Sequence, residues 1–158
     1  MKPSPLQLRL MVFNKVFVEA EDVEIGDSPE DQFDFEGVTV ETNVQVNPFT
    51  GTENDGQVFV AQLLFRVLNE TGRRCPYKLD FSVSGVFEVV KQIDVAEREV
   101  FVAVNGTTLL FGAIREQVSS ITARSGNGLL LLPTVNFLDL KKPKVPAAES
   151  PAAPQVPA

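Results

Sequence analysis

Residues 58–68 carry apolar side chains on both faces of what their β-branched and aromatic composition predicts to be a β-strand. Successive side chains of a strand point to opposite faces of its sheet. One face is apolar throughout and comprises Phe59, Ala61, Leu63, Phe65 and Val67. Most of the other face is also apolar and comprises Val58, Val60, Leu64 and Leu68. Because such a strand is covered on both sides, the fold must supply two apolar covers for it.

Three further segments alternate apolar and polar residues, and they predict strands over residues 6–18, 38–46 and 76–89. The alternation shifts at Asn14 and Lys15, which predicts a bulge in the first strand. The connections between the strands are of hairpin length and rich in turn residues. We therefore expect an antiparallel meander of four strands.

Apolar residues recur at helical spacing over residues 107–123 and predict one long helix there. Residues 95–104 fit either a helix or a strand, because their apolar run is short and β-branched. Asn136 is expected to cap a very short second helix over residues 137–142, which Pro143 stops. Four strands followed by helices indicate an α+β domain. Since one long helix covers only one face of the sheet, the other face needs either a second subunit or a bound client.

The length of 158 residues is typical of one domain with a substantial core. We expect this domain to occupy residues 1–142. Residues 143–158 are rich in proline and alanine, which is typical of a disordered, extended tail.

The formal net charge of −7 disfavours nucleic acid and anionic membrane surfaces as partners, because both require a basic face. The first residues lack the apolar core of a signal peptide, and no apolar run is long enough to cross a membrane. The single cysteine, Cys75, rules out an internal disulfide and suits a reducing compartment. We expect a cytoplasmic protein that does not insert into a membrane.

Residues 129–132 are four consecutive leucines, preceded by Gly126 and Gly128 and followed by Pro133. The glycines and the proline argue against a regular helix or a central strand. An apolar loop of this kind is buried, paired with another subunit, or used to hold something apolar. Consecutive residues of an extended loop cannot all point one way, so we expect two of the leucines to face the core.

Catalytic residue types are scarce in this chain. It has no histidine and one cysteine, which rules out Ser-His-Asp and Cys-His catalysis and makes a structural zinc site implausible. No phosphate-binding loop or dinucleotide fingerprint is present. We therefore expect neither an enzyme nor a protein that needs a metal, a cofactor or ATP.

Several motifs stand at the spacing of a known family. They are the segment 110–116 with its Arg115-Glu116 pair, Arg124, the Leu-Pro-Thr-Val-Asn-Phe segment 132–137, the Gly-Val-Phe segment 85–87 and the opening strand 6–20. Together these features resemble the SecB export chaperones over about residues 6–140.

The resemblance implies a four-stranded antiparallel sheet with two helices, assembled as a homotetramer that is a dimer of dimers. It also implies ATP-independent binding of unfolded precursor proteins in long apolar grooves. We expect the following side chains to line such a groove: Val38, Val40, Leu129, Leu130, Leu131 and Leu132.

The resemblance further implies that clients pass to the SecA motor, which the family binds through acidic residues on the solvent face of the sheet. By position, Glu19 and Asp80 match two of these acidic sites, although both also fit a simple solvated face. Lys15 stands where the family usually has an acid, and Pro143 makes the second helix shorter than usual.

Two other functions remain open. Relatives of SecB serve as chaperones dedicated to the antitoxin of a toxin–antitoxin module, and the short second helix and Lys15 would suit such a role. A non-chaperone alternative is an oligomeric adaptor whose tail, residues 143–158, binds a proline-recognition domain.

Overall fold

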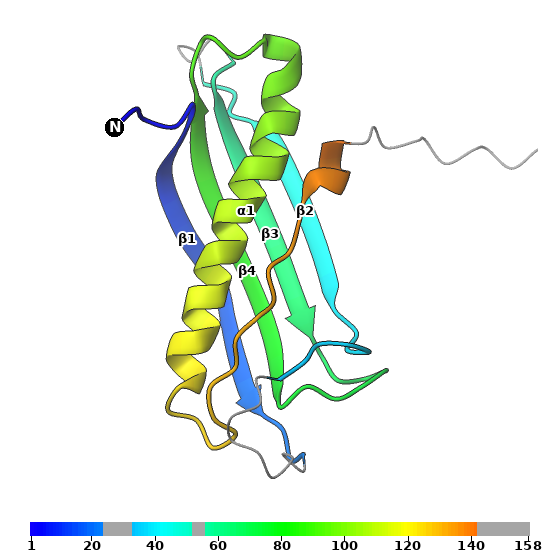
Figure 1. Ribbon diagram of the computed structural model, residues 1–158. Helices are drawn as coiled ribbons and strands as arrows, with labels where there is room; N and C mark the ends of the chain where they lie inside the picture. The colour runs from blue at the N-terminus through cyan, green and yellow to red at the C-terminus, as the bar shows by residue number, and fades with distance from the viewer. Residues whose placement is uncertain (24–32, 52–55, 142–158) are drawn as a thin grey trace, which may run out of the picture.

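The computed structural model describes residues 1–23, 33–51 and 56–141 (Figure 1). The predicted tail, residues 143–158, lies outside the described residues. The elements are β1 (Leu6–Ala20), β2 (Glu41–Pro48), β3 (Val58–Val67), β4 (Tyr77–Val89), α1 (Val95–Thr122) and the 3-10 helix η1 (Leu138–Lys141). The four strands form one antiparallel sheet with α1 along one face, which confirms the predicted α+β class.

The order of strands in the sheet is β1-β4-β3-β2. Strands β2, β3 and β4 follow one another as predicted, but β1 pairs with β4, so the predicted meander is wrong for the first strand. The physical reason is length. The 15 residues of β1 match the 13 of β4, whereas β2 has only 8 residues and would leave half of β1 unpaired.

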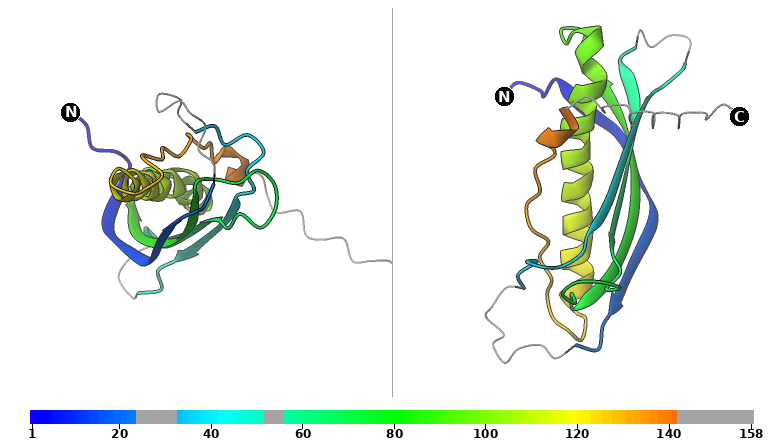
Figure 2. Two further views of the ribbon diagram at one scale, coloured as in Figure 1. Left: turned by 90° about the horizontal axis from the view of Figure 1, so that it is seen from below. Right: turned by 90° about the vertical axis from the view of Figure 1, so that its right-hand side faces the viewer.

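The pairing of β1 with β4 is interrupted twice, between Leu8 and Leu10 and between Phe13 and Lys15. The second interruption confirms the bulge predicted from the shift in alternation. Each bulge adds a residue to β1 and strengthens its twist, so that β1 curls around the edge of the sheet (Figure 2).

Helix α1 begins at Val95, twelve residues before the predicted start at Thr107. The Asp94 side chain caps it by accepting a hydrogen bond from the backbone N–H of Ala96 at 3.1 Å. The ambiguous residues 95–104 are helical because Val102 and Val104 then lie buried on the sheet. The second helix is only one 3-10 turn, capped as predicted by Asn136, whose side-chain oxygen accepts from the N–H of Leu138 at 2.9 Å.

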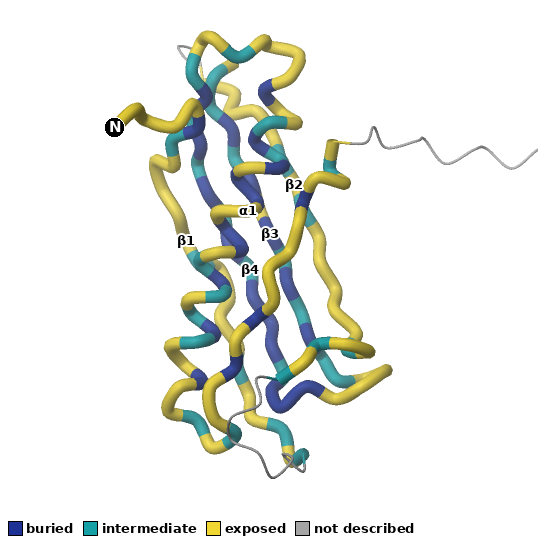
Figure 3. Tube along the Cα trace, in the orientation of Figure 1, coloured by how far each residue is buried: buried dark blue, intermediate teal, exposed yellow. Residues whose placement is uncertain are grey.

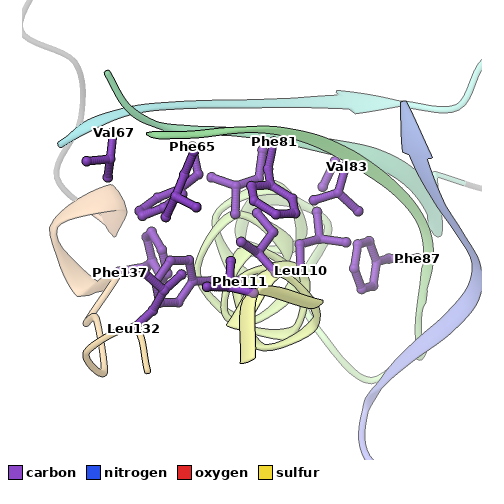
Figure 4. Close-up of a cluster of buried hydrophobic side chains, with 14 of the residues drawn as sticks. Phe65, Val67, Phe81, Val83, Phe87, Leu110, Phe111, Leu132 and Phe137 are labelled. Atoms are coloured by element: carbon purple, nitrogen blue, oxygen red, sulfur yellow. The ribbon is translucent and has the colours of Figure 1, made fainter. Parts of the chain in front are cut away.

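The core lies between α1 and the inner faces of β3 and β4, and includes Phe65, Phe81 and Leu110 (Figure 4). The ring of Phe87 occupies the space that side chains would need at two glycines. A Cβ at Gly85 would lie 2.7 Å from this ring, and one at Gly106 would lie 3.2 Å from it. The absence of side chains at Gly85 and Gly106 therefore leaves room for the Phe87 ring to pack against α1.

The opposite, outer face of the sheet has no cover within the described part of the chain. Burial consequently alternates along β3 and β4, whereas most of β1 is exposed (Figure 3). Leu10, Val12 and Phe17 of β1 share this outer face by register and are exposed. One long helix thus covers one face only, as the sequence predicted, and the need for a second cover remains.

Candidate functional site

The segment that follows α1 turns back at Gly126-Asn127-Gly128 and runs beside the helix towards η1 (Figures 1 and 2). Gly128 has φ 75°, which favours glycine. The side-chain amide of Asn127 donates hydrogen bonds to the carbonyl oxygens of Glu21 and Pro76, both at 2.7 Å. This turn is therefore fastened to the end of β1 and the start of β4.

Residues 129–137 are here called the crossover segment. Its four leucines point alternately to the surface and to the core. Leu130 and Leu132 are 1% exposed and belong to the core, whereas Leu129 is 56% and Leu131 40% exposed. The expectation that two of the four leucines face the core is confirmed. Of the four leucines, Leu129 and Leu131 are therefore the two on the surface.

Three hydrogen bonds fix this alternation. The backbone N–H of Leu130 donates to Thr122 Oγ1 at 2.9 Å, and Arg115 Nε donates to the carbonyl oxygen of Leu132 at 3.0 Å. The Tyr77 hydroxyl donates to the carbonyl oxygen of Gly128 at 2.6 Å. Burial raises the pKa of the Tyr77 hydroxyl, so the group stays a donor at neutral pH.

The far end of the crossover segment is held by aromatic packing. Phe137 lies edge-on to Phe111 at 5.8 Å between ring centroids, and Phe111 lies edge-on to Phe65 of β3 at 5.4 Å (Figure 4). Such pairs add to the stabilisation that comes from buried area. Both ends of the segment are thus anchored, and its exposed leucines sit on a fixed support.

The two valines expected in the groove wall precede β2, because that strand begins at Glu41 and not at Val38 as predicted. Val38 forms an isolated bridge with Gly72 and packs against the core cluster that contains Leu130 and Leu132. Val40 is exposed. Of the six predicted groove residues, three are therefore exposed: Val40, Leu129 and Leu131.

Asp80 lies on the outer face of the sheet but is only 7% exposed. Its carboxylate accepts a hydrogen bond from Lys15 Nζ and another from Arg66 Nε at 3.2 Å, and Arg66 also contacts Glu41 at 3.6 Å. Burial acts to raise the pKa of Asp80, but the hydrogen bonds from Lys15 and Arg66 outweigh it and hold that pKa below its ordinary value. The negative charge of Asp80 is therefore compensated within the chain.

Glu19 is exposed and pairs loosely with Lys78 at 3.6 Å, while Lys78 lies closer, at 2.9 Å, to Glu21. Of the two predicted acidic sites, only Glu19 presents its carboxylate to solvent. The sequence revealed Lys15 as a departure from the family but not Arg66, because the pairing of Arg66 with Asp80 depends on the β3–β4 register.

No helix among the described residues is long and apolar enough to pass through a bilayer. No cluster of at least three acidic or cysteine side chains among residues 1–23, 33–51 and 56–141 is arranged to hold a metal ion.

Comparison with known proteins connects these features to a family. The family model of the preprotein translocase subunit SecB matches residues 7–146. The protein-export protein SecB of Nitrosospira multiformis is 28% identical over 143 residues, which cover 90% of this chain and 87% of that protein.

Among solved structures, the SecB-like chaperone of Mycobacterium tuberculosis in complex with a ChAD peptide from the HigA1 antitoxin is 18% identical, with a TM-score of 0.47. That match covers 82% of this chain and 90% of the other. A Streptococcus agalactiae protein of unknown function is 13% identical, with a TM-score of 0.49, and the match covers 81% of this chain and 96% of the other. Because the family model spans most of the sequence, this chain belongs to the SecB family.

Proposed function

We propose that this protein is a cytoplasmic, ATP-independent chaperone that holds non-native precursor polypeptides on its crossover segment. The observation that carries the proposal is the exposure of Leu129 and Leu131 on a segment whose neighbouring residues are hydrogen-bonded to α1. When a client covers such a side chain, the free energy of binding becomes more favourable by about 25 cal/mol for each Å² of apolar surface removed from water. This gain does not depend on direction, so it suits clients of many sequences.

The six predicted groove residues take two roles in this proposal. Val40, Leu129 and Leu131 contact the client, while Val38, Leu130 and Leu132 form the support beneath them. Because the net charge is −7, we expect cationic unfolded segments to be captured faster than acidic ones.

The test is suppression of aggregation of a chemically unfolded client without nucleotide. We expect the wild type to suppress aggregation at stoichiometric amounts and the variant Leu129→Ser/Leu131→Ser to lose most of this activity. The control is Val95→Ser, which removes another exposed apolar side chain at the start of α1. No suppression by the wild type would end the chaperone proposal.

We further propose that clients pass to SecA and that Glu19 contributes to that contact. Asp80 can contribute only if SecA displaces Lys15 and Arg66 from its carboxylate. A chaperone dedicated to one antitoxin is the second candidate. It is favoured by the compensation of Asp80 and by the reduction of the second helix to a single 3-10 turn.

A pulldown from the source cells separates these two candidates. Recovery of SecA with many precursors supports the export role. Recovery of a single small partner supports the dedicated role. The variant Glu19→Gln is expected to weaken SecA recovery in the first case and to leave the second unchanged.

In this proposal, other copies of the chain cover the exposed apolar surfaces of the sheet. The free edge of β1 carries exposed apolar residues on its inner face, namely Leu8, Met11 and Val16, as well as on its outer face. We propose that copies of the chain associate through this strand as part of a homotetramer. Light scattering tests this directly, and a monomer at micromolar concentration would contradict it.

A further inference from the structure

Asparagine stands directly before glycine at two places in this chain, at Asn105 and at Asn127. Such a pair is prone to spontaneous deamidation, because glycine has no Cβ to obstruct the approach of its backbone nitrogen to the asparagine side chain. The nitrogen bonds to the side-chain carbon Cγ, the Cγ–Nδ2 bond breaks, and ammonia leaves with the proton of the attacking nitrogen. Water then opens the resulting succinimide ring and leaves aspartate or isoaspartate in place of asparagine.

The two pairs differ in how far the structure must open before this reaction can take place. Asn105 and Gly106 lie within α1, where the hydrogen bonds of the helix hold the backbone. Gly106 is buried against the ring of Phe87. Freeing its nitrogen requires α1 to come apart beside the core, which costs a large part of the free energy of unfolding.

Asn127 and Gly128 lie instead in the turn between α1 and the crossover segment, where Gly128 is exposed. In the closed turn, the N–H of Gly128 donates to the carbonyl oxygen of Ser125 at 3.0 Å. The side-chain amide of Asn127 is held by the carbonyl oxygens of Glu21 and Pro76, both at 2.7 Å. These few bonds protect the pair, but a local opening of the turn is enough to free both reacting groups.

We propose that Asn127 is a modification site, at which spontaneous deamidation releases the start of the crossover segment from the sheet. The Asn127 side chain fastens the turn because its NH2 group donates to two carbonyl oxygens, one just after β1 at Glu21 and one just before β4 at Pro76. Aspartate and isoaspartate are ionised at neutral pH and have no donor to offer. Their negative charge would also lie against the same two oxygens. The turn therefore cannot close again in its original form, and the release is irreversible.

The chain contains its own probe of this turn. Tyr77 is the only tyrosine, and the chain has no tryptophan, so the intrinsic emission of the protein comes from Tyr77 alone. Tyr77 is 1% exposed, and its hydroxyl donates to the carbonyl oxygen of Gly128 at 2.6 Å. Opening of the turn removes this acceptor and uncovers the hydroxyl end of the ring. The chemistry needs neither a client nor a partner, so it is independent of the holding function.

The first test compares the two pairs within the same wild-type molecule. The full-length protein is aged at mildly alkaline pH, in native buffer and in concentrated urea, and both sites are followed by mass spectrometry with chromatographic separation of isoaspartate. In urea, Asn105 and Asn127 are expected to deamidate at similar rates, because glycine follows both. In native buffer, we expect deamidation of Asn127 to exceed that of Asn105 by about tenfold or more. Equal protection of the two sites in native buffer, including complete protection of both, would overturn the proposal.

The second test measures the release of the turn by acrylamide quenching of the Tyr77 emission at neutral pH. The full-length variant Asn127→Asp stands for the aspartate product, and we expect clearly stronger quenching than in the wild type with the same circular dichroism spectrum. Asn105→Asp adds the same charge to α1 and is expected to quench as the wild type does. Should Asn127→Asp not fold, aged wild-type protein separated by ion exchange supplies the same measurement. Unchanged quenching in the deamidated protein would overturn the release.

Discussion

At the scale of single residues, two buried threonines of α1 differ in the hydrogen bonds of their hydroxyl groups. Thr122 Oγ1 accepts from the N–H of Leu130 and donates to the carbonyl oxygen of Val118 at 2.7 Å. Thr107 Oγ1 is equally buried but has no hydrogen-bond partner among the described residues. Replacing threonine by valine should therefore lower the free energy of unfolding at position 122 but not at position 107.

Thr122→Val is expected to lower the free energy of unfolding by about 1–3 kcal/mol, because the N–H of Leu130 is left buried without an acceptor. It should also weaken client binding by releasing the start of the crossover segment. Urea denaturation and client anisotropy measure the two effects. Thr122→Ser keeps the hydroxyl and serves as the control for both, and equal behaviour of the two variants would contradict the role of this bond.

Thr107→Val is expected to leave stability unchanged or to raise it by about 1 kcal/mol, because a methyl group replaces an unsatisfied buried hydroxyl of the same size. Client binding should be unaffected. A marked loss of stability in urea denaturation would show that the Thr107 hydroxyl has a partner in solution.

Asp80→Asn tests the ion pairs of the outer face. The pKa of Asp80 is lowered in the folded protein, so its stabilising contribution is fully present above the ordinary aspartate pKa, about 3.9. The contribution is lost as the pH falls through the lower, folded value. We expect the variant to be less stable than the wild type at pH 7, because it lacks the charge that Lys15 and Arg66 bind, and this difference to shrink below about pH 4.

Urea denaturation of both proteins between pH 7 and pH 2 measures this effect. Glu70→Gln, which changes an exposed carboxylate on the β3–β4 connection, is the control and should show little difference at any pH. A difference that stays constant down to pH 2 would exclude the carboxylate charge of Asp80 as its cause.

At the scale of elements, the contact of α1 with β4 depends on small residues beneath Phe87. Gly85→Ala is expected to destabilise the protein by about 1–3 kcal/mol, because the new Cβ would lie 2.7 Å from the ring of Phe87 and 2.9 Å from Leu110. Thermal unfolding measures the loss. The double variant Gly85→Ala/Phe87→Leu should recover part of it if the ring is the obstacle.

Gly112→Ala is the matched control on α1. A Cβ at this exposed position meets no atom within 4 Å, so alanine should stabilise the helix by about 1 kcal/mol. Destabilisation by Gly112→Ala would indicate that another molecule packs closely against α1.

The sequence predicted individual elements better than their partners. Alternation correctly located β4 and the bulge at Lys15, because these depend on which face of a strand is dry, while β-branched and aromatic composition located β3. The partner of β1 was missed because both β2 and β4 offer alternating strands, and only their lengths distinguish them. The start of α1 was missed because β-branched residues such as Val102 and Val104 fit a strand equally well from their sequence alone. Their burial against the sheet is what favours the helix.

The candidate site was predictable to a similar extent. The leucine run and its alternation could be read from the sequence, since four consecutive apolar residues in a loop must divide between core and surface. The anchors Tyr77, Arg115 and Thr122 could not be identified, because their hydrogen bonds form only once the segment turns back along α1 and over the start of β4. The compensation of Asp80 by Arg66 was hidden for the same reason.

At the scale of the whole molecule, membership of the SecB family makes this protein a chaperone and not an enzyme. Within residues 1–23, 33–51 and 56–141, nothing covers one face of the sheet or most of β1. An isolated chain with so much exposed apolar surface is expected to associate.

The inner face of β1 provides a test of that association. We expect Leu8→Ser/Met11→Ser to lower the mass measured by light scattering without changing the circular dichroism spectrum, because both side chains are exposed in the single chain. Val95→Ser, at another exposed site, should leave the mass unchanged. An unaltered mass in the double variant would place the interface elsewhere.

The pairing of β1 with β4 has a consequence for synthesis on the ribosome. Ala20 pairs with Tyr77 and Leu6 with Val89, so the first strand emerges long before its partner is made. During that interval, a 15-residue segment in which apolar and polar side chains alternate is unpaired and open to capture. Each newly made copy of the chaperone thus passes through a state of the kind that its finished form is built to bind.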